Sequence, residues 1–238
     1  MSAHDDRPRD DKPLRALMDT LFAAHPWHGI EPGDPADTLT AYIELVPTDA
    51  VKYELDKKSG ALRIDRPQRY SSLAPMPYGF FPQTYCGTSV AARGAERTGA
   101  SPVHGDGDPM DVCVLTEKTL AHGGFLARVR PIGGLRMIDG EEADDKIVAV
   151  LESDLAWGHL RELADCPDAI IERLKHYFLT YKQLPGEGPR KVQIAEQYDR
   201  AEAIEMVRRS LQDYRDEFGL PEERLPLLRR LLRDSQGP

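Results

Sequence analysis

The chain has 238 residues, of which 40% are apolar and 30% are charged, and its formal net charge is −9. This composition is typical of a globular protein that buries a substantial core, in one large domain or two small ones. The negative charge argues against nucleic acid as a partner, and no apolar run approaches the ~18 residues of a membrane-spanning helix. Three cysteines without Cys-x-x-Cys spacing favour free thiols in a reducing compartment, so we expect a cytoplasmic protein.

Residues 1–38 are predicted to form an N-terminal extension. Residues 1–12 are largely charged residues and proline, which predicts disorder. Leucine and methionine then recur at helical spacing, which predicts one short helix over residues 14–24. Pro26 ends this helix, and residues 29–37 are predicted to be a linker.

A β-rich body is expected to follow this extension. Strand propensity and turn residues predict strands at Tyr42–Val46, Val51–Asp56 and Ala61–Asp65. Alternation along the second strand places Lys52 and Glu54 on one face, and in the first strand Glu44 lies opposite its apolar neighbours. By themselves these charges are more typical of a sheet face exposed to solvent than of a binding site.

The middle of the chain contains a predicted insertion and further strands. Residues 75–79 are too broken by proline and glycine for regular structure, and residues 86–105, rich in Ala, Gly, Arg and Ser, are predicted to be a surface insertion. We expect Cys86, at the border of this insertion, to be exposed, and Cys113 to be buried. Strands are predicted at residues 111–115, 125–129, 135–138 and 146–151. Short strands at close spacing are typical of a small barrel or sandwich.

The last third of the chain is predicted to be mainly helical. Pro167 precedes an apolar stripe that extends to Tyr181 and predicts a helix, and a short strand is expected at residues 191–195. Asp199 and Glu202 form the pattern of a capping box at the start of another helix. We therefore expect one domain over residues 39–218, followed by a C-terminal helical tail at residues 219–238.

The most informative stretch is the hexapeptide Asp106-Gly107-Asp108-Pro109-Met110-Asp111. Its glycine and proline hold three carboxylates close to a tight bend, directly before a buried strand. Clustered carboxylates raise one another's pKa unless a cation lies among them, and Mg²⁺ is the usual cation for oxygen ligands. A merely solvated acidic turn is the alternative. A calcium loop is excluded, because its fifth and sixth positions require Asp or Asn and then Gly, where this sequence has Met110 and Asp111.

A second acidic group consists of Asp139, Glu141, Glu142, Asp144 and Asp145. By itself it is typical of a solvated hairpin loop. If it faces the first group, the two could hold more than one divalent ion, an arrangement suited to phosphoryl chemistry. The side chains placed to meet phosphate oxygens are Lys52, Arg66, Lys146, Lys182, Tyr78 and Tyr181. Tyr181 is equally well placed to be a core residue of its helix.

Taken together, these residues resemble the family I soluble inorganic pyrophosphatases. The Asp-Gly-Asp-Pro-x-Asp hexapeptide is the signature of that family, and the resemblance covers about residues 40–200. It rests also on the order of the flanking residues, which are Glu44, Lys52, Tyr53, Glu54, Gly60, Asp65, Arg66, Tyr78, Gly79, Asp139, Asp144, Asp145, Lys146, Tyr181 and Lys182. The resemblance implies a mainly β (α+β) fold, a five-stranded OB-like barrel with helices packed beside it. It also implies Mg²⁺-dependent hydrolysis of pyrophosphate to two phosphates by a metal-activated water.

The resemblance also implies a role for each matching residue. Asp106, Asp111, Asp139 and Asp144 match the ligands of several Mg²⁺ ions, for which Mn²⁺ or Zn²⁺ are alternative ions. Asp108 matches the catalytic base. Lys52, Arg66, Tyr78, Lys146, Tyr181 and Lys182 match the residues that bind pyrophosphate, and Glu44 and Glu54 match supporting acidic residues. The implied partners are the small-molecule substrate and further copies of the chain in a homo-oligomer, with no nucleic acid and no membrane.

Two features depart from the family pattern. Ala74 stands where many members have a tyrosine, and Tyr70 is a nearby candidate to replace it. The 27 residues between Tyr78 and Asp106 form a longer segment than in compact bacterial members. Neither departure removes a predicted metal ligand, so we expect an active enzyme.

Two other functions remain open at this point. The same site would also suit other phosphoanhydrides or short polyphosphates. A non-catalytic OB-type module that binds an acidic ligand or partner through the barrel is a second alternative. OB barrels commonly bind nucleic acid, which the net charge of −9 and the acidic turns oppose here. The segment from Arg224 to Arg233 is either a docking helix for a partner or a partly solvated amphipathic end.

Overall fold

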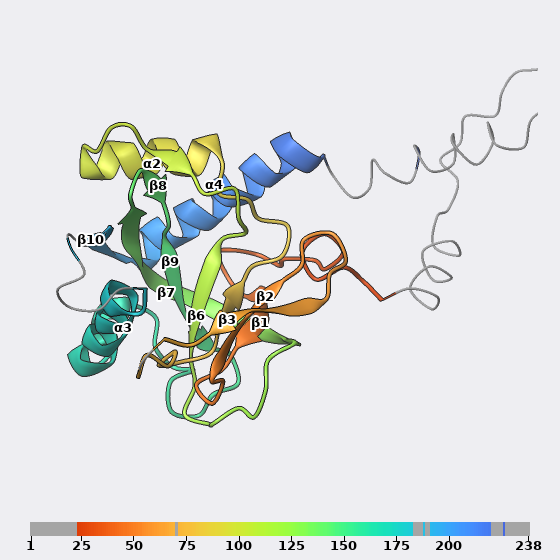
Figure 1. The fold of residues 1–238 in the computed structure, drawn as a ribbon, viewed down its shortest axis with the longest axis vertical. Coiled ribbons are helices and arrows are strands. Elements are labelled where there is room, and N and C mark those ends of the chain that lie inside the picture. Colours follow the sequence, from red (N-terminus) through yellow and green to blue (C-terminus); the bar gives the residue numbers. More distant parts are fainter. Residues whose placement is uncertain (1–22, 70, 183–187, 189–190, 220–225, 227–238) are drawn as a thin grey trace, which may run out of the picture.

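The protein is described from a computed structural model, which covers residues 23–69, 71–182, 188, 191–219 and 226. Its centre is a ring of five strands, each hydrogen-bonded to the next (Figure 1). In order around the ring the strands are β1 (Leu39–Leu45), β4 (Tyr78–Phe80), β6 (Asp111–Leu115), β9 (Lys146–Leu151) and β7 (Phe125–Asp139), and β7 pairs with β1 to close it. This mainly β architecture with flanking helices confirms the predicted fold class.

The central strands β6 and β9 are buried on both faces, which explains their uninterrupted apolar sequences. On β6, Val112 and Val114 belong to a core cluster that includes residues of helix α4 (Arg200–Phe218). Cys113 and Leu115 belong to a second cluster that includes residues of helix α3 (Asp168–Thr180). Because side chains alternate along a strand, each strand supplies both cores. The predicted bounds of β6 and β9 and the predicted burial of Cys113 are confirmed.

Strand β7 is one continuous strand of 15 residues, so the prediction of two separate strands is wrong. Its first part pairs with β1, its middle with β9 and its last part with β10 (Val192–Asp199). The register shifts between Pro131 and Gly133, which marks a bulge. The bulge bends the strand without ending it, so the two predicted segments are parts of one strand.

The predicted hairpin near the start of the domain is confirmed. It consists of β2 (Val51–Leu55) and β3 (Leu62–Pro67), which form a separate two-stranded sheet. Residues 75–79 are less irregular than predicted, because β4 begins at Tyr78. A side chain at Gly79 would collide with the backbone of Tyr42 on β1, so this close strand pairing requires glycine. The two remaining short strands are β5 (His104–Gly105) and β8 (Glu142–Ala143).

Helices α3 and α4 begin where the sequence predicts. Pro167 occupies the N-cap position of α3, and a short 3₁₀ turn at Leu163–Asp165 precedes it. The Asp199 carboxylate accepts a hydrogen bond of 3.0 Å from the Glu202 backbone N–H and caps α4. The Glu202 carboxylate is directed toward two arginines instead of completing the capping box.

The inserted segment folds into helix α2 (Thr88–Thr98), which packs on α4 (Figure 1). The Asp213 carboxylate of α4 accepts hydrogen bonds of 2.9–3.1 Å from the backbone N–H groups of Gly87, Ser89 and Val90, which anchors the start of α2. Cys86 is buried, so the prediction that it is exposed is wrong. The insertion lies against the barrel core at this point, and Cys86 belongs to the same core cluster as α4.

The described part of the N-terminal extension packs on the domain. Trp27 is buried, its indole N–H donates to the Thr84 carbonyl at 2.7 Å, and its ring lies against Phe218. Most of the predicted helix at residues 14–24, Tyr70 and nearly all of the predicted tail lie outside the described residues. Among the residues that the structure describes, no helix has both the length and the apolar character needed to span a membrane.

Candidate active site

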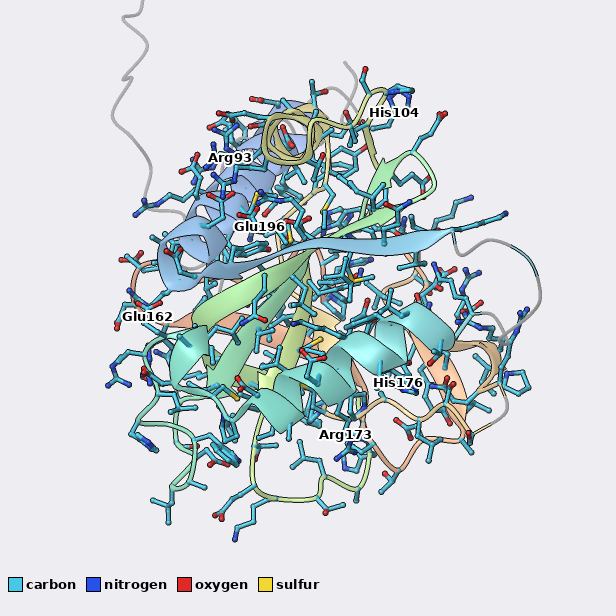
Figure 2. All side chains as sticks on the ribbon, turned by 90° about the vertical axis from the view of Figure 1, so that its left-hand side faces the viewer. Arg93, His104, Glu162, Arg173, His176 and Glu196 are labelled. Carbon is cyan, nitrogen blue, oxygen red and sulfur yellow. The ribbon has the colours of Figure 1, made fainter. Side chains whose placement is uncertain are left out.

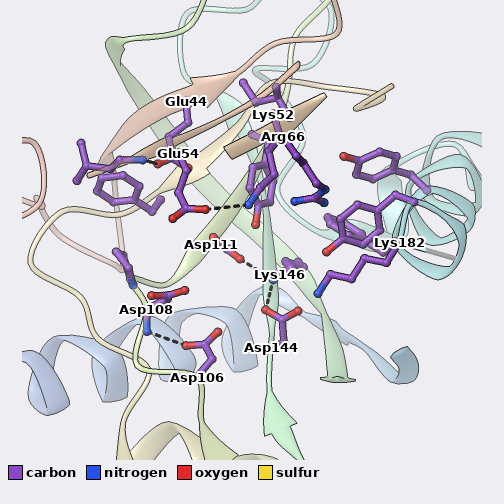
Figure 3. A pocket seen from close by; sticks show the side chains of 18 of the residues that line it. Glu44, Lys52, Glu54, Arg66, Asp106, Asp108, Asp111, Asp144, Lys146 and Lys182 are labelled. Carbon is purple, nitrogen blue, oxygen red and sulfur yellow. Dashed lines mark hydrogen bonds and ion pairs between the residues drawn. The ribbon is translucent and has the colours of Figure 1, made fainter. Parts of the chain in front are cut away.

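A pocket of about 230 Å³ opens where the β2–β3 hairpin, the barrel and α3 meet. Figure 3 shows the acidic hexapeptide on one side of it, Arg66 and Lys182 on the other, and Lys146 between them. The predicted site residues that line it are Glu44, Lys52, Glu54, Arg66, Tyr78, Asp106, Asp108, Asp111, Asp144, Lys146, Tyr181 and Lys182. The structure therefore brings together side chains from positions 44 to 182 that are distant in sequence.

The acidic turn is held by its own backbone. Gly107 has a φ of +73°, in the left-handed region that favours glycine, and the Asp108 N–H donates to the Asp106 carboxylate at 2.9 Å. The Met110 N–H donates to the Thr84 hydroxyl at 2.9 Å. These bonds fix the turn at the mouth of β6 and place its carboxylates along the pocket wall.

Lys146 links the two acidic groups from the start of β9. Its side chain is 2% exposed, and its ammonium contacts the Asp144 carboxylate and lies 2.5 Å from that of Asp111. Burial by itself would lower the pKa of Lys146, but these two carboxylates outweigh it and hold the pKa well above its usual value. The lysine is thus a fixed positive charge at the centre of the pocket.

Several pocket carboxylates lack enough positive charge around them. Burial and the nearby Asp144 raise the pKa of Asp106, and burial raises the pKa of Asp144 itself. Burial raises the pKa of Glu44 to about 8, although its carboxylate accepts a hydrogen bond of 2.7 Å from the Leu55 N–H. A site of this kind attracts a cation, because a positive charge among the carboxylates stabilises their ionised form.

The opposite wall carries the basic side chains. Lys52 lies 3.2 Å from the Asp65 carboxylate, and Arg66 lies 2.5 Å from the same carboxylate. Lys182, which follows α3, lies 2.5 Å from Asp139. Asp139 differs from the other predicted residues, because it lines an adjoining hollow that shares Arg66 and Lys182 with the pocket.

Two tyrosines close the pocket beside α3. Burial and the Asp111 carboxylate raise the pKa of the Tyr78 phenol well above its usual value, so Tyr78 is a neutral hydrogen-bond donor. The Tyr181 ring stacks on that of Tyr177, with centroids 5.0 Å apart. Tyr181 therefore meets both expectations, since it packs against the core cluster of α3 and also lines the pocket.

Comparison with known proteins agrees with this arrangement. The family model described as inorganic pyrophosphatase matches residues 41–215. The chain belongs to the inorganic pyrophosphatase family. It is 45% identical to the inorganic pyrophosphatase of Chlamydia trachomatis serovar L2 over 199 residues, which are 82% of this chain and 95% of that protein.

Solved structures of inorganic pyrophosphatases share the fold. The enzyme from Thermus thermophilus is 29% identical and superposes with a TM-score of 0.66, covering 81% of this chain and 99% of that one. The enzyme from Neisseria gonorrhoeae is 28% identical, with a TM-score of 0.64 and coverage of 78% and 96%. The similarity thus extends over almost the full length of both enzymes.

The pyrophosphatase-type site contains residues that the sequence did not single out. Lys57, in the turn after β2, contacts the Asp108 carboxylate, and Tyr177 lines the pocket. Asp65, which is in the run of residues that carries the family resemblance but had no predicted role, binds Lys52 and Arg66. The position of Lys57, two residues beyond β2, is the feature of the sequence that could have indicated it as a site residue. Ala74, where many pyrophosphatases have a tyrosine, is buried in the core cluster of α3.

The donor set suits a metal, but it is not preassembled as a metal cage. Among the described residues no three acidic, histidine or cysteine side chains converge closely enough to hold an ion as they stand. Lysine ammonium groups contact Asp108, Asp111, Asp139 and Asp144 instead. All these acidic donors are oxygen atoms, as Mg²⁺ prefers, and the raised pKa values of Asp106 and Asp144 indicate a need for cationic charge.

Proposed function

We propose that this chain hydrolyses pyrophosphate to two phosphates. Membership of the inorganic pyrophosphatase family supports the reaction. The observation that carries the proposal is the pocket itself, in which the carboxylates of Asp106, Asp108 and Asp111 face a wall containing Arg66 and Lys182. A polyanionic substrate needs such a wall, and a nucleophilic water needs a carboxylate that accepts its proton.

Inorganic pyrophosphatases depend on a metal, and we propose Mg²⁺ for this one, with Mn²⁺ or Zn²⁺ as substitutes. The residues proposed to hold it are Asp106, Asp111, Asp139 and Asp144. When bound, such ions lower the pKa of water and screen the charge of pyrophosphate. Asp139 would join this set from the adjoining hollow, where it now binds Lys182.

The remaining residues have proposed roles that follow from their charges and positions. Asp108 accepts the proton of the attacking water, and it is half exposed at the pocket wall. Lys146 at the centre and Lys182 and Arg66 on the wall neutralise the phosphates as the bridging bond breaks. The other residues proposed to bind substrate are Lys52, Tyr78 and Tyr181, while Glu44 and Glu54 support the hairpin and its basic groups.

The test is phosphate release from pyrophosphate without metal and with Mg²⁺, Mn²⁺ or Zn²⁺, in the wild type and in Asp108→Asn. The turn is held by the Asp106 carboxylate and not by that of Asp108, so the substitution should leave the fold intact. Loss of a general base is expected to lower kcat by about 10²–10⁴-fold. Phosphate release that persists in Asp108→Asn would show that Asp108 is not the catalytic base. If the wild type releases no phosphate with any of the three metals, the fold binds a ligand without catalysing this reaction. Parallel assays with tripolyphosphate and ATP define the range of substrates.

We also propose that the chain forms a homo-oligomer in a reducing compartment. Leu155 is 91% exposed, and Leu126 is 50% exposed on β7. Where exposed apolar side chains form a contiguous patch they mark an interaction surface, so these two leucines are candidate contacts between subunits. The three cysteines are free and buried, which agrees with a reducing compartment. Light scattering after size exclusion measures the mass, and a monomer would contradict the proposal.

A further inference from the structure

Arg136 is a fully buried arginine in the second half of β7. Its guanidinium donates at 2.9 Å to Glu196 of β10 and at 2.5 Å to Glu202 of α4. A buried guanidinium is tolerated only when carboxylates surround it, so two strands, β7 and β10, and one helix, α4, meet around this one charge.

Asp145 is the third carboxylate in this cluster and is also buried. Its Oδ2 atom lies 3.5 Å from Arg136 Nε and accepts a hydrogen bond of 3.1 Å from the Tyr198 hydroxyl. The Arg136 guanidinium in turn lies over the Tyr198 ring, 5.0 Å from its centroid. Asp145 is therefore held in place from two directions.

Asp145 lies between two residues of the pocket in the sequence. Asp144 and Lys146 line the pocket, whereas Asp145 does not, as expected where successive side chains point to opposite faces. The backbone is tied here too, since the Asp144 N–H donates to the Met137 carbonyl at 3.0 Å. The cluster behind the sheet and the pocket in front of it thus share one stretch of backbone.

The inserted helix α2 completes the charge balance of the cluster. Arg93 grips the Glu202 carboxylate with two hydrogen bonds of 3.0 and 2.6 Å, and Arg97 contacts Glu196. Figure 2 shows Arg93 on α2 and Glu196 on β10 on the same side of the molecule. Three arginines therefore face three carboxylates, and two of these arginines come from the insertion.

We propose that Arg136 and Asp145 are positioning residues for Asp144 and Lys146, and that α2 supports them through Arg93. The proposal rests on the proposed roles of Asp144 in metal binding and of Lys146 in substrate binding. A side chain that orients a metal ligand affects how well the site binds the ion, because the ligand must be held at the productive geometry. The insertion is thus part of the support of the active site.

The test measures the affinity of the substrate-free protein for Mn²⁺ by titration calorimetry, together with kcat and KM over a range of Mg²⁺ concentrations. Asp145→Asn keeps the size of the side chain and an acceptor for Tyr198, but it removes the charge beside Arg136. We expect metal affinity about 10-fold weaker than in the wild type. Arg93→Ala should weaken it by about twofold or more, and Arg93→Lys should lie between Arg93→Ala and the wild type because lysine cannot form the two-pronged contact.

Arg209→Ala is the matched control. Arg209 also joins α4 to α2, through Ser89, and pairs with Glu205 on its own helix, but no hydrogen bond or ion pair links it to the Arg136 cluster among the described residues. We expect unchanged metal affinity in this variant. A purely structural role would lower the unfolding temperature of Asp145→Asn and Arg93→Ala while their folded fraction binds metal like the wild type, and that result would overturn the proposal. If Asp145→Asn does not fold, Arg93→Ala, whose arginine is partly exposed, decides the question. Failure of the wild type to bind metal or hydrolyse pyrophosphate would instead refute the proposed function.

Discussion

Glu44→Gln should stabilise the metal-free protein, and more so as the pH rises. Glu44 is 7% exposed on β1, and its carboxylate accepts a hydrogen bond from the Leu55 N–H that a glutamine oxygen can also accept. Burial raises its pKa from 4.5 to about 8, with the Asp111 carboxylate acting in the same direction. The buried, ionised form is therefore unfavourable in the folded protein.

The sign follows from which state holds the proton. Below about pH 4.5 Glu44 is protonated in both the folded and the unfolded chain, so it does not lower the free energy of unfolding. As the pH rises to about 8 the unfolded chain loses the proton first, so the folded protein becomes progressively less stable. The difference between the Glu44 pKa values of the unfolded and folded states corresponds to about 5 kcal/mol. This is an upper limit for the increase in unfolding free energy that Glu44→Gln produces at pH 8.5.

The assay is urea unfolding of the wild type and Glu44→Gln in EDTA, at intervals from pH 5 to 8.5. Asp106 and Asp144 titrate in both proteins, so the difference between the two unfolding free energies isolates Glu44. That difference should grow with pH and should narrow when Mg²⁺ is added, because a divalent cation stabilises ionised carboxylates. A difference that is independent of pH, or one that favours the wild type at pH 8.5, would refute the reasoning.

Three further predictions concern the turn, the insertion and the thiols. Lys57→Gln should change the unfolding free energy by less than about 1 kcal/mol, because Lys57 and Asp108 are both about half exposed. The substitution removes one cation from the pocket, so steady-state assays should show a higher KM for pyrophosphate. Asp213→Ala removes the acceptor of three N–H groups at the start of α2 and should lower the unfolding free energy, measured by thermal unfolding, by about 2–4 kcal/mol. The control Asp216→Ala, at an exposed residue of the same helix as Asp213, should have little effect, and equal losses of stability in the two variants would contradict this account. Burial raises the pKa of the Cys86 thiol, and Cys113 and Cys166 are also buried. A thiol reagent should therefore label none of the three until the protein unfolds, and rapid labelling of Cys86 would be inconsistent with its position.

Local signals in the sequence determined much of the fold. Strands β6 and β9 were predicted with their observed bounds, because uninterrupted apolar residues suit strands that are buried on both faces. Asp199 was identified as the cap of α4 from its spacing to Glu202 alone. The hexapeptide from Asp106 to Asp111 was recognisable for a similar reason, since its carboxylates, glycine and proline are adjacent in the chain and shape one turn.

Other features were decided only when distant segments met. Residues 130–134 separate the two strands predicted in this region, yet β7 runs through them because β9 pairs with it on both sides of the bulge and β10 pairs with it from Gly133 onward. Cys86 is buried because the insertion packs on α4, and Lys57 belongs to the site because its hairpin folds over the acidic turn. The partners of Arg136 come from β10, from α4 and from the connection between β8 and β9, and the sequence does not reveal that they meet. Turns and strands arise from neighbouring residues, whereas burial and ion pairing depend on which surfaces the whole fold brings together.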